Sequence, residues 1–323
     1  MNVFVTGGTG FVGAHLVRAL ERRGDRVTCL VRDGRKAAGL GWRNVRIVEG
    51  DLDRGAALRD GCSGAEVVVH VAGRISAHTL HEFMTINRDG TAAVLEAAAD
   101  AGSPRFVYVS SLAVGGPSAP GRPVDERGAP APVTDYGRSK LAGELLVRAS
   151  GLPWTIVRPP VVYGEWDREI LKVFKLARHG IAPVFGDGSQ ALSVIHAGDL
   201  ATALIAAAST PRAAGRVYYA AHPRPTTSRD FASAIGRAVG ATPRVVPIPG
   251  PVARGVLWVI GSAARLAGRA TVLSADKANE FLAPGWTCSS AALTADTGWR
   301  AEIDLEPGLR RTAEWYRTQG WLK

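Results

Sequence analysis

The chain has 323 residues, 46% hydrophobic and 21% charged, a composition typical of a globular protein that buries a core without disulfides or metal ions. The formal net charge is +10, but the basic residues form no run of five. We therefore expect a generally basic surface, or steering of an anionic ligand, and no nucleic-acid partner. The three cysteines lack metal-ligand spacing, which predicts no metal site and fits a reducing compartment.

Neither the start of the chain nor its most apolar later stretch is typical of a membrane protein. The first strand begins at Asn2 with no basic region or cleavage site before it, so we expect no signal peptide and a cytoplasmic location. Residues 252–273 are apolar but contain Arg254, Arg265 and Arg269, which argues against an integral span. A packed amphipathic helix is the main interpretation of this segment, and contact with a membrane surface is the alternative.

Short apolar runs alternate with helical patterns in the first half of the chain. The predicted strands are Asn2–Thr6, Arg26–Val31, Val45–Glu49, Glu66–His70, Arg105–Ser110 and Trp154–Arg158. The predicted helices between them are Phe11–Arg23, Ala56–Asp60, Leu80–Ala101 and Tyr136–Ser150. Continuous apolar runs such as Val67–Val69 are typical of strands that are covered on both faces. The pattern predicts an α/β fold with a doubly wound parallel sheet, a Rossmann domain.

The regular alternation of predicted strands and helices ends after Gly164, where proline and glycine become frequent. Helices are predicted over Arg168–His179, Ser228–Val239 and Leu309–Gln319. A strand over Leu192–His196 and a helix over Asp199–Ala208 are expected to return to the first domain. We therefore expect a larger domain over 1–165, joined by 189–210, and a smaller, mostly helical substrate-binding lobe over the remainder of 166–323.

A glycine-rich loop lies between the first predicted strand and the first helix. Its glycines fall where a tight turn, a close approach of a pyrophosphate and helix–strand packing each exclude a side chain. The free N–H groups at the start of the helix would hold the pyrophosphate. The loop residues predicted to contact a bound dinucleotide are Thr6, Gly7, Gly10, Phe11, Val12 and Gly13.

The end of the second strand bears on which dinucleotide is bound. NAD-binding enzymes usually place an acid there to bond the ribose hydroxyls, but this chain has Val31 followed by Arg32. A guanidinium clamps a 2′-phosphate, so the sequence favours NADP(H) over NAD. NAD remains an alternative cofactor because of Asp33, since a small shift in register would return an acid to this position.

Two further strand ends are predicted to border the cofactor. Asp51 and Leu52 follow the third strand, where they would border the adenine; an ordinary turn is the alternative. Ala72 and Gly73 follow the fourth strand and lack bulk where the cofactor must pass.

Tyr136 and Lys140 are one turn apart on a predicted helix and share a face. Lowering a tyrosine pKa from about 10 to about 7 takes about 4 kcal/mol, which is close to what one ammonium at about 4 Å supplies at an effective dielectric of about 20. Tyr136 could then exchange a proton with a carbonyl oxygen. Ser110 and Ser111 close the fifth strand, where such folds bind ligands, although a serine there is often only a cap.

Together these motifs resemble the extended short-chain dehydrogenase/reductase superfamily over essentially the whole chain. The resemblance includes Arg158-Pro159-Pro160, Val162-Tyr163-Gly164 and the later stretch 193–199. It implies that Ser111 polarises the substrate oxygen, that Tyr136 is the acid/base, and that Lys140 lowers the tyrosine pKa and bonds the nicotinamide ribose. It also implies that Pro159 and Val162 flank the nicotinamide, and that Asn87 is structural or adjacent to the cofactor.

Within the superfamily, the residues after the serine favour a reductase or dehydrogenase. Dehydratases and decarboxylases usually carry an acid there, whereas this chain has Leu112 and Ala113. Residues 114–117 look closer to hydroxysteroid dehydrogenase and dihydroflavonol reductase relatives than to epimerases. An NADP(H)-dependent oxidoreductase acting on a small molecule is the main hypothesis. A sugar-nucleotide epimerase and a non-catalytic dinucleotide sensor remain alternatives.

Two expectations concern the rest of the molecule. Several aromatic residues of the second half would either line an apolar substrate pocket or belong to the core: Trp166, Phe185, Trp258, Phe281 and Trp286. The resemblance also implies a homodimer that forms through the helices Leu80–Ala101 and Tyr136–Ser150.

Overall fold

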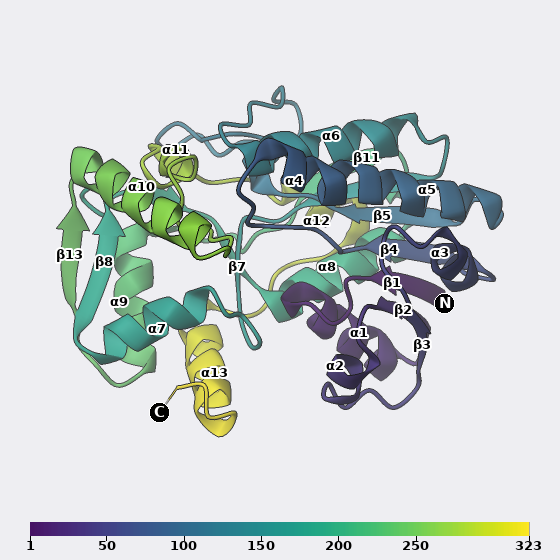
Figure 1. Ribbon diagram of the computed structural model, residues 1–323, viewed down its shortest axis with the longest axis horizontal. Coiled ribbons are helices and arrows are strands. Elements are labelled where there is room, and N and C mark those ends of the chain that lie inside the picture. The colour runs from purple at the N-terminus through teal and green to yellow at the C-terminus, as the bar shows by residue number, and fades with distance from the viewer. Residues whose placement is uncertain (323) are drawn as a thin grey trace.

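The centre of the molecule is a parallel sheet of seven strands in the order β11-β6-β5-β4-β1-β2-β3, in a computed structural model that describes residues 1–322 (Figure 1). Six strands come from the first half of the chain: β1 (Asn2–Thr6), β2 (Arg26–Val31), β3 (Val45–Glu49), β4 (Val67–His70), β5 (Arg105–Val109) and β6 (Trp154–Arg158). The seventh, β11 (Arg216–Tyr219), pairs with β6 at the edge. The doubly wound Rossmann architecture expected from the sequence is therefore confirmed.

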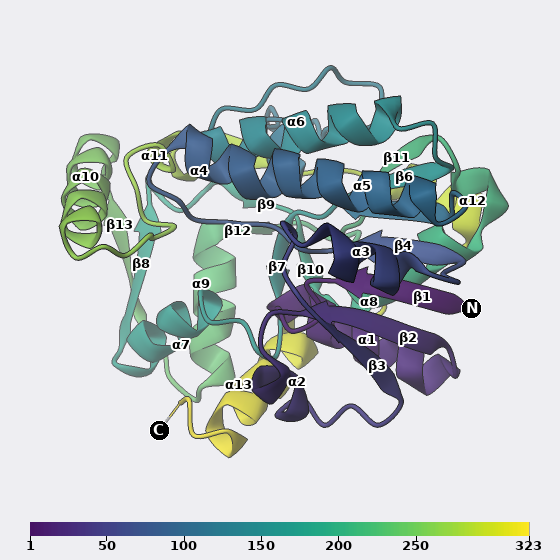
Figure 2. The ribbon, with the colours of Figure 1, turned by 45° about the vertical axis from the view of Figure 1, so that its right-hand side comes forward.

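Helices cover both faces of this sheet (Figure 2). On one face α1 (Phe11–Arg23) packs beside α8 (Ala197–Ser209), and their apolar sides share a core with the strands. The other face carries α3 (Gly55–Cys62), α4 (Leu80–Met84), α5 (Gly90–Asp100) and α6 (Asp135–Ala149). Because both faces are covered, strand residues such as Val5 and Val68 are fully buried, which explains their continuous apolar sequences.

The predicted helix Leu80–Ala101 is a single helical segment with one irregular turn. Residues Thr85–Asp89 form a π-helical turn between α4 and α5. Such turns are frequent at functional sites, because they rotate a side chain out of the regular helical register. Here the turn contains Asn87, which is buried.

The predicted strand Leu192–His196 is wrong as a single element. The structure has two short strands, β9 (Ala191–Leu192) and β10 (Val194–His196), which belong to different sheets. β9 pairs with β12 (Thr226–Thr227) and β14 (Gly285–Trp286), whereas β10 pairs with β7 (Val161–Tyr163). The chain changes partners at Ser193, whose N–H donates to the carbonyl of Trp286 at 2.8 Å.

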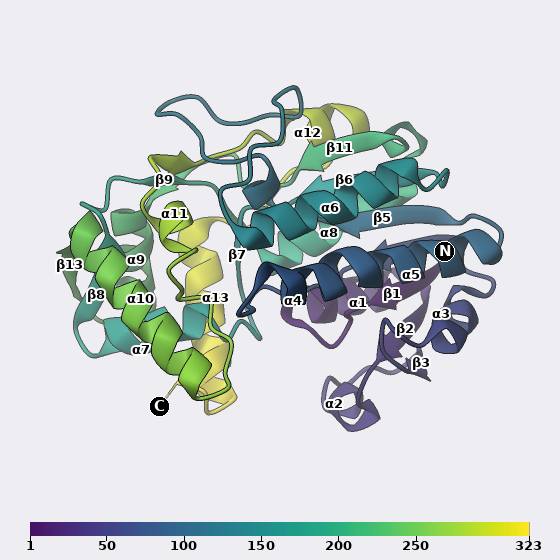
Figure 3. The same ribbon diagram turned by 45° about the horizontal axis from the view of Figure 1, so that its top comes forward.

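The second half of the chain builds a mostly helical lobe, as expected. Its core lies between α7 (Ile170–Arg178), α9 (Ser228–Ala238) and α13 (Leu305–Thr318). A parallel strand pair, β8 (Ile181–Phe185) and β13 (Arg244–Ile248), leads to α10 (Gly250–Leu266) and the short α11 (Ala278–Phe281). Figure 3 shows α10 along the outer edge of the lobe. In residues 1–322 no helix has both the length and the apolar character needed to cross a bilayer.

Three short elements complete the path. Helix α2 (Gly34–Ala38) follows β2, and the 3₁₀ turns η2 (Leu112–Val114) and η3 (Pro211–Ala213) follow β5 and α8. Helix α12 (Ala291–Thr297) packs beside β11 and α8, and so joins the Rossmann part of the molecule.

Candidate active site

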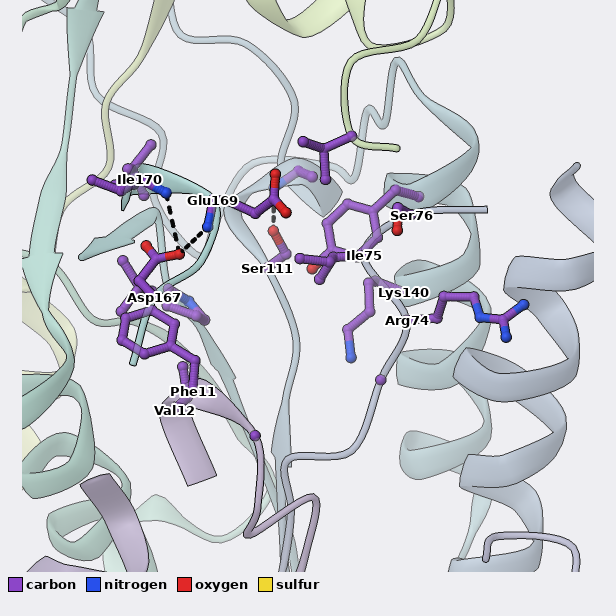
Figure 4. A pocket seen from close by; sticks show the side chains of 18 of the residues that line it. Phe11, Val12, Arg74, Ile75, Ser76, Ser111, Lys140, Asp167, Glu169 and Ile170 are labelled. Atoms are coloured by element: carbon purple, nitrogen blue, oxygen red, sulfur yellow. Dashed lines mark hydrogen bonds between the residues drawn. The ribbon is translucent and has the colours of Figure 1, made fainter. Parts of the chain in front are cut away.

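A cavity of about 1190 Å³ lies between the carboxyl ends of the central strands and the helical lobe. Ser111 and Lys140 face it from one side, and Phe11 and Val12 from the other (Figure 4). Sixteen residues singled out from the sequence line it: Gly7, Gly10, Phe11, Val12, Gly13, Arg32, Asp51, Leu52, Ala72, Gly73, Ser110, Ser111, Tyr136, Lys140, Pro159 and Val162. The fold therefore brings strand ends from distant parts of the sequence to one place, as doubly wound sheets do.

Thr6 is not among the lining residues, because its side chain is fully buried below the loop. Its Oγ1 lies 2.6 Å from Nδ1 of His70, and Nε2 of that ring lies 3.0 Å from Oγ1 of Thr91. Burial lowers the pKa of His70 to about 3, so the ring is neutral. Thr91 donates its own proton to the carbonyl of Asn87, so we assign the His70 proton to Nε2 and the donated proton at Nδ1 to Thr6.

The glycine loop is a cradle made of backbone. Gly7 has a φ of +74°, and a Cβ there would lie 2.6 Å from the amide nitrogen of Ala72. A Cβ on Gly13 would lie 2.1 Å from the carbonyl oxygen of Gly7. Gly10 caps α1 without a side chain, so the first N–H groups of the helix are left free for an anionic ligand. These features fit the pyrophosphate of a dinucleotide.

The end of β2 presents cations to the cavity. Arg32 and Lys36 both line it. The carboxylate of Asp33 instead caps α2, where it accepts a hydrogen bond from the N–H of Arg35 at 2.9 Å. Asp33 is not among the cavity-lining residues. The acid that made NAD an alternative cofactor in the sequence analysis therefore caps a helix instead.

Ser111 has two roles in the local structure. Its Oγ accepts from the N–H of Ala113 at 3.1 Å and so caps η2, as serines at strand ends often do. The same hydroxyl is near enough to the phenol of Tyr136 to lower its pKa, and Ser111 lines the cavity. The cap fixes the serine side chain in a position from which it reaches the tyrosine.

Tyr136 and Lys140 lie one turn apart on α6, which begins at a Thr134 cap. Burial raises the pKa of Tyr136 to about 12. The Ser111 hydroxyl has the opposite, smaller effect on this pKa. Burial also lowers the pKa of Lys140 to about 7, and the carboxylate of Glu144 opposes that change. The expectation that Lys140 brings the pKa of Tyr136 near 7 is therefore not met by the chain's own groups, because burial is the largest influence on that pKa and raises it.

Asn87 is a structural clamp beside the cavity. Its Oδ1 accepts from the N–H of Arg74 at 2.7 Å, and its Nδ2 donates to the carbonyl of Arg74 and to Oγ of Ser139. A Cβ on Gly73 would lie 3.2 Å from Oδ1 of Asn87 and 3.6 Å from Nζ of Lys140. The amide thus fixes the strand end that lies against Lys140.

A buried ion pair supports the floor of the site. Arg158 and Glu144 are 2% and 0% exposed, and two guanidinium nitrogens donate to the carboxylate at 2.8 and 2.7 Å. Ser110 donates to the same carboxylate at 2.5 Å, and Arg158 also donates to the hydroxyl of Tyr219. Because every charge here is paired and hydrogen-bonded, the network fixes the ends of β5 and β6 that carry the site.

Three site residues were not identified from the sequence. Nζ of Lys277 lies 5.0 Å from the centroid of the Tyr136 ring, and Lys277 pairs with Glu280. Asp167 is buried in the cavity wall, and burial raises its pKa to about 6, although two N–H groups donate to it. Only folding brings the 277–280 segment onto α6, so no local pattern could have indicated it.

Part of the far wall of the cavity is apolar. The rings of Phe185 and Phe281 stack with centroids 4.8 Å apart, and Trp286 also lines this side. Further apolar lobe residues line the cavity: Ile170, Val173, Val184, Leu192 and Phe231. Polar lobe residues line it as well: Asp167, Glu169, Gln190, Ser228, Lys277 and Glu280. Of the remaining aromatic candidates, Trp166 packs against Arg18 and Trp315, and Trp258 lies at a second, smaller cavity.

A Rossmann sheet with a backbone cradle at its first helix, and a serine, tyrosine and lysine at one cavity, defines an enzyme that uses a nicotinamide dinucleotide. The model of the NAD dependent epimerase/dehydratase family matches residues 3–221, so the chain belongs to that family. The resemblance to extended short-chain dehydrogenases/reductases drawn from the motifs is thereby confirmed.

Known proteins similar to this chain include reductases. It is 38% identical to a ceramide reductase of Caulobacter vibrioides over 99% of this chain and 96% of that protein. It is 32% identical to the 4-hydroxy-2-methyl-3-oxo-4-farnesyl-3,4-dihydroquinoline-1-oxide ketoreductase of Stigmatella aurantiaca, over 87% and 91% of the two chains. The solved structure of MoeE5 with UDP-glucose and NAD matches with 25% identity and a TM-score of 0.79 over 99% of both chains. The interpretation of the chain as an oxidoreductase is confirmed.

Proposed function

We propose that this protein is an NADP(H)-dependent reductase that acts on the ketone of an apolar small molecule. The observation that carries the proposal is the shared cavity, which has Ser111 and Tyr136 at its polar end and the Phe185–Phe281 wall at the other. The polar end would hold the carbonyl oxygen, and the apolar end would hold a hydrocarbon portion of the substrate.

The choice of NADP(H) is supported by the charges at the end of β2. Arg32 and Lys36 line the cavity, whereas Asp33 is turned to its own helix cap. A 2′-phosphate placed here would meet two cations and no carboxylate from this strand end, and guanidinium–phosphate pairs are strong, bidentate contacts. A ribose hydroxyl of NAD would find no acid in the expected place.

Each side chain of the polar end has a defined role in the reduction. Bound NADPH would supply the hydride. Ser111 would donate a hydrogen bond to the carbonyl oxygen, and Tyr136 would donate the proton that the new alkoxide takes up. A phenol with a pKa of about 12 is protonated at neutral pH, which is the form that reduction needs. Lys140 would bond the cofactor ribose and stabilise the tyrosinate that remains.

The names of the relatives indicate a lipid-like substrate. One relative is named for a ceramide and the other for a farnesyl-bearing quinoline. A ceramide carries a secondary alcohol near an amide, so the matching substrate for reduction is a long-chain keto amide. The apolar part of the lobe wall, with Phe231 and Leu192, suits the hydrocarbon portion of such a chain.

The test is NADPH oxidation by the purified full chain with three substrates: a long-chain keto amide, a short water-soluble ketone and UDP-glucose. We expect oxidation with the ketones and preference for the long-chain one. Conversion of UDP-glucose with tightly retained NAD(H), and no net consumption of NADPH, would identify an epimerase instead. Binding of NADPH without turnover of any ketone, unchanged by Tyr136→Phe, would identify a dinucleotide sensor.

A homodimer in the cytoplasm is also part of the proposal. Helices α4, α5 and α6 pack side by side on one face of the sheet, and Leu145 on α6 is 58% exposed. The three cysteines are buried and unpaired, which fits a reducing compartment. Light scattering after gel filtration measures the oligomeric state. A monomeric mass at micromolar concentration would contradict the dimer.

A further inference from the structure

Helix α10 has an apolar stripe that faces away from the protein. Of its seventeen residues only Ala253 and Leu257 are buried. On another side of the helix Val252, Val256, Val259, Ala263 and Leu266 follow one another at alternating spacings of four and three, which places them on one face. All five are exposed, and Leu266 is 91% exposed. An ordinary surface helix has the reverse arrangement, because its apolar face packs on the core.

A third side of α10 carries residues that are typical of interfacial helices. Trp258 is 63% exposed and shares a flank of α10 with Arg254 and Arg265, four and seven positions away. Tryptophan and arginine are the side chains that favour the boundary between lipid headgroups and acyl chains.

The charge of this region has one sign. Between Asp230 and Asp276 the sequence has five arginines, no lysine and no acidic residue. Three of them, Arg254, Arg265 and Arg269, lie on or just after α10 and are exposed. This arrangement complements an anionic bilayer surface, where each basic side chain near the headgroups adds to the attraction.

We propose that α10 docks this protein on the surface of an anionic lipid bilayer. The stripe from Val252 to Leu266 would enter the boundary of the acyl chains, and Arg254 and Arg269 would lie near the headgroup phosphates. The helix would lie in the plane of the surface, since it lacks the length and apolar character to cross the bilayer.

A second cavity connects the docking helix with the candidate active site. Its volume is about 180 Å³, and Trp258, Gly261 and Arg265 of α10 line one side. Tyr136 and Lys277 line it as well, and both also line the larger cavity. Arg265 donates to the carbonyl of His78 at 3.2 Å and so ties α10 to the loop before α4.

The position of this cavity suggests that docking serves to deliver substrate to the active site. A substrate that leaves the bilayer beside α10 would reach Tyr136 without crossing open water. This delivery role rests on the proposed reduction of an apolar substrate, whereas binding to the bilayer does not depend on it.

The binding is tested by flotation of the full chain with vesicles, which requires no turnover. The vesicles are phosphatidylcholine alone, or phosphatidylcholine with about one third phosphatidylglycerol. We expect the protein to float with the anionic vesicles, and to float less at high salt because the arginine contribution is screened. The double variant Val259→Asp/Leu266→Asp should lower the bound fraction by about tenfold or more, since two apolar side chains no longer leave water. Both positions are exposed, so its melting temperature should match that of the wild type.

The matched control is Leu176→Asp, which places an acid on another exposed apolar position, on α7 of the same lobe. This variant should float like the wild type. Failure of the wild type to float with anionic vesicles would overturn the proposal, and so would flotation that the double variant leaves unchanged. A wild-type dimer that the double variant converts to a monomer, without any vesicle binding, would identify the stripe as a protein interface and also overturn it.

Turnover separates this proposal from the proposed function. The double variant should oxidise NADPH with a short soluble ketone as fast as the wild type, and should lose turnover of a long-chain ketone held in anionic vesicles. If the wild type floats but reduces no ketone, the docking stands and the reductase function fails. If it reduces the soluble ketone but does not float, the docking fails and the function stands.

Discussion

Arg32 and Asp33 are neighbours in the chain, but their side chains point to different parts of the structure and have different roles. Arg32 lines the cofactor-sized cavity, and Asp33 accepts the N–H of Arg35 to cap α2. The cap removes the acid from the position in which it would repel a phosphate, and the cation stays there. This division is the structural reason for proposing a phosphorylated dinucleotide as the cofactor.

Replacement of the cation should change the cofactor preference. Arg32→Ser removes a charge-assisted contact, a class worth about 1.5–3 kcal/mol, so the ratio of kcat/KM for NADPH over NADH should fall by about tenfold or more. Arg46→Ser is the control, because Arg46 is an exposed arginine on β3 that pairs with Asp60 outside the cavity. An unchanged ratio in Arg32→Ser would remove this residue from cofactor recognition.

The glycine cradle predicts a difference between two glycines that both have a positive φ. Gly7→Ala places a Cβ 2.6 Å from a backbone nitrogen, whereas a Cβ at Gly24, with a φ of +84°, meets nothing within 4 Å. Gly24→Ala should cost about 1 kcal/mol of stability from backbone strain alone and leave cofactor affinity unchanged. Gly7→Ala should weaken NADPH binding, measured by fluorescence titration, by at least about tenfold. Equal affinities in the two variants would contradict the cradle.

Lys140 predicts a pH dependence of stability. Its folded pKa of about 7 lies below the ordinary lysine value of 10.5, so between these values the unfolded chain binds more protons than the folded one. Stability should therefore rise with pH in this window. Relative to Lys140→Met, the free energy of unfolding of the wild type should rise by about 2 kcal/mol from about pH 7 to about pH 9 in urea titrations. A flat difference would mean that the lysine is solvated or firmly paired.

Much of the Rossmann part could be predicted from local sequence. The bounds of β1, β2, β3 and β6 match the predicted strands, because each is a short apolar or alternating run. β1, β2 and β6 are mostly buried, whereas the edge strand β3 is mostly exposed. The cavity-lining residues followed from their positions at strand ends, which the topology of a parallel sheet brings together.

What escaped prediction depends on long-range contacts. β11 completes the sheet but is only four residues long, and it follows the lobe-side strands β8, β9 and β10 in the chain. Lys277 reaches the Tyr136 ring from a segment with no motif of its own. The pKa of Tyr136 also lies above the value expected from the sequence, because folding buries the phenol.

We propose the phenol of Tyr136 as the proton donor in an NADPH-dependent ketone reduction. The most direct measurement is steady-state NADPH oxidation by the wild type and Tyr136→Phe with a saturating ketone, alongside NADPH affinity of both proteins. We expect turnover by the wild type and a loss of at least about a hundredfold in the variant, with NADPH affinity kept within a few fold. Turnover by Tyr136→Phe at the wild-type rate would show that Tyr136 is not the proton donor.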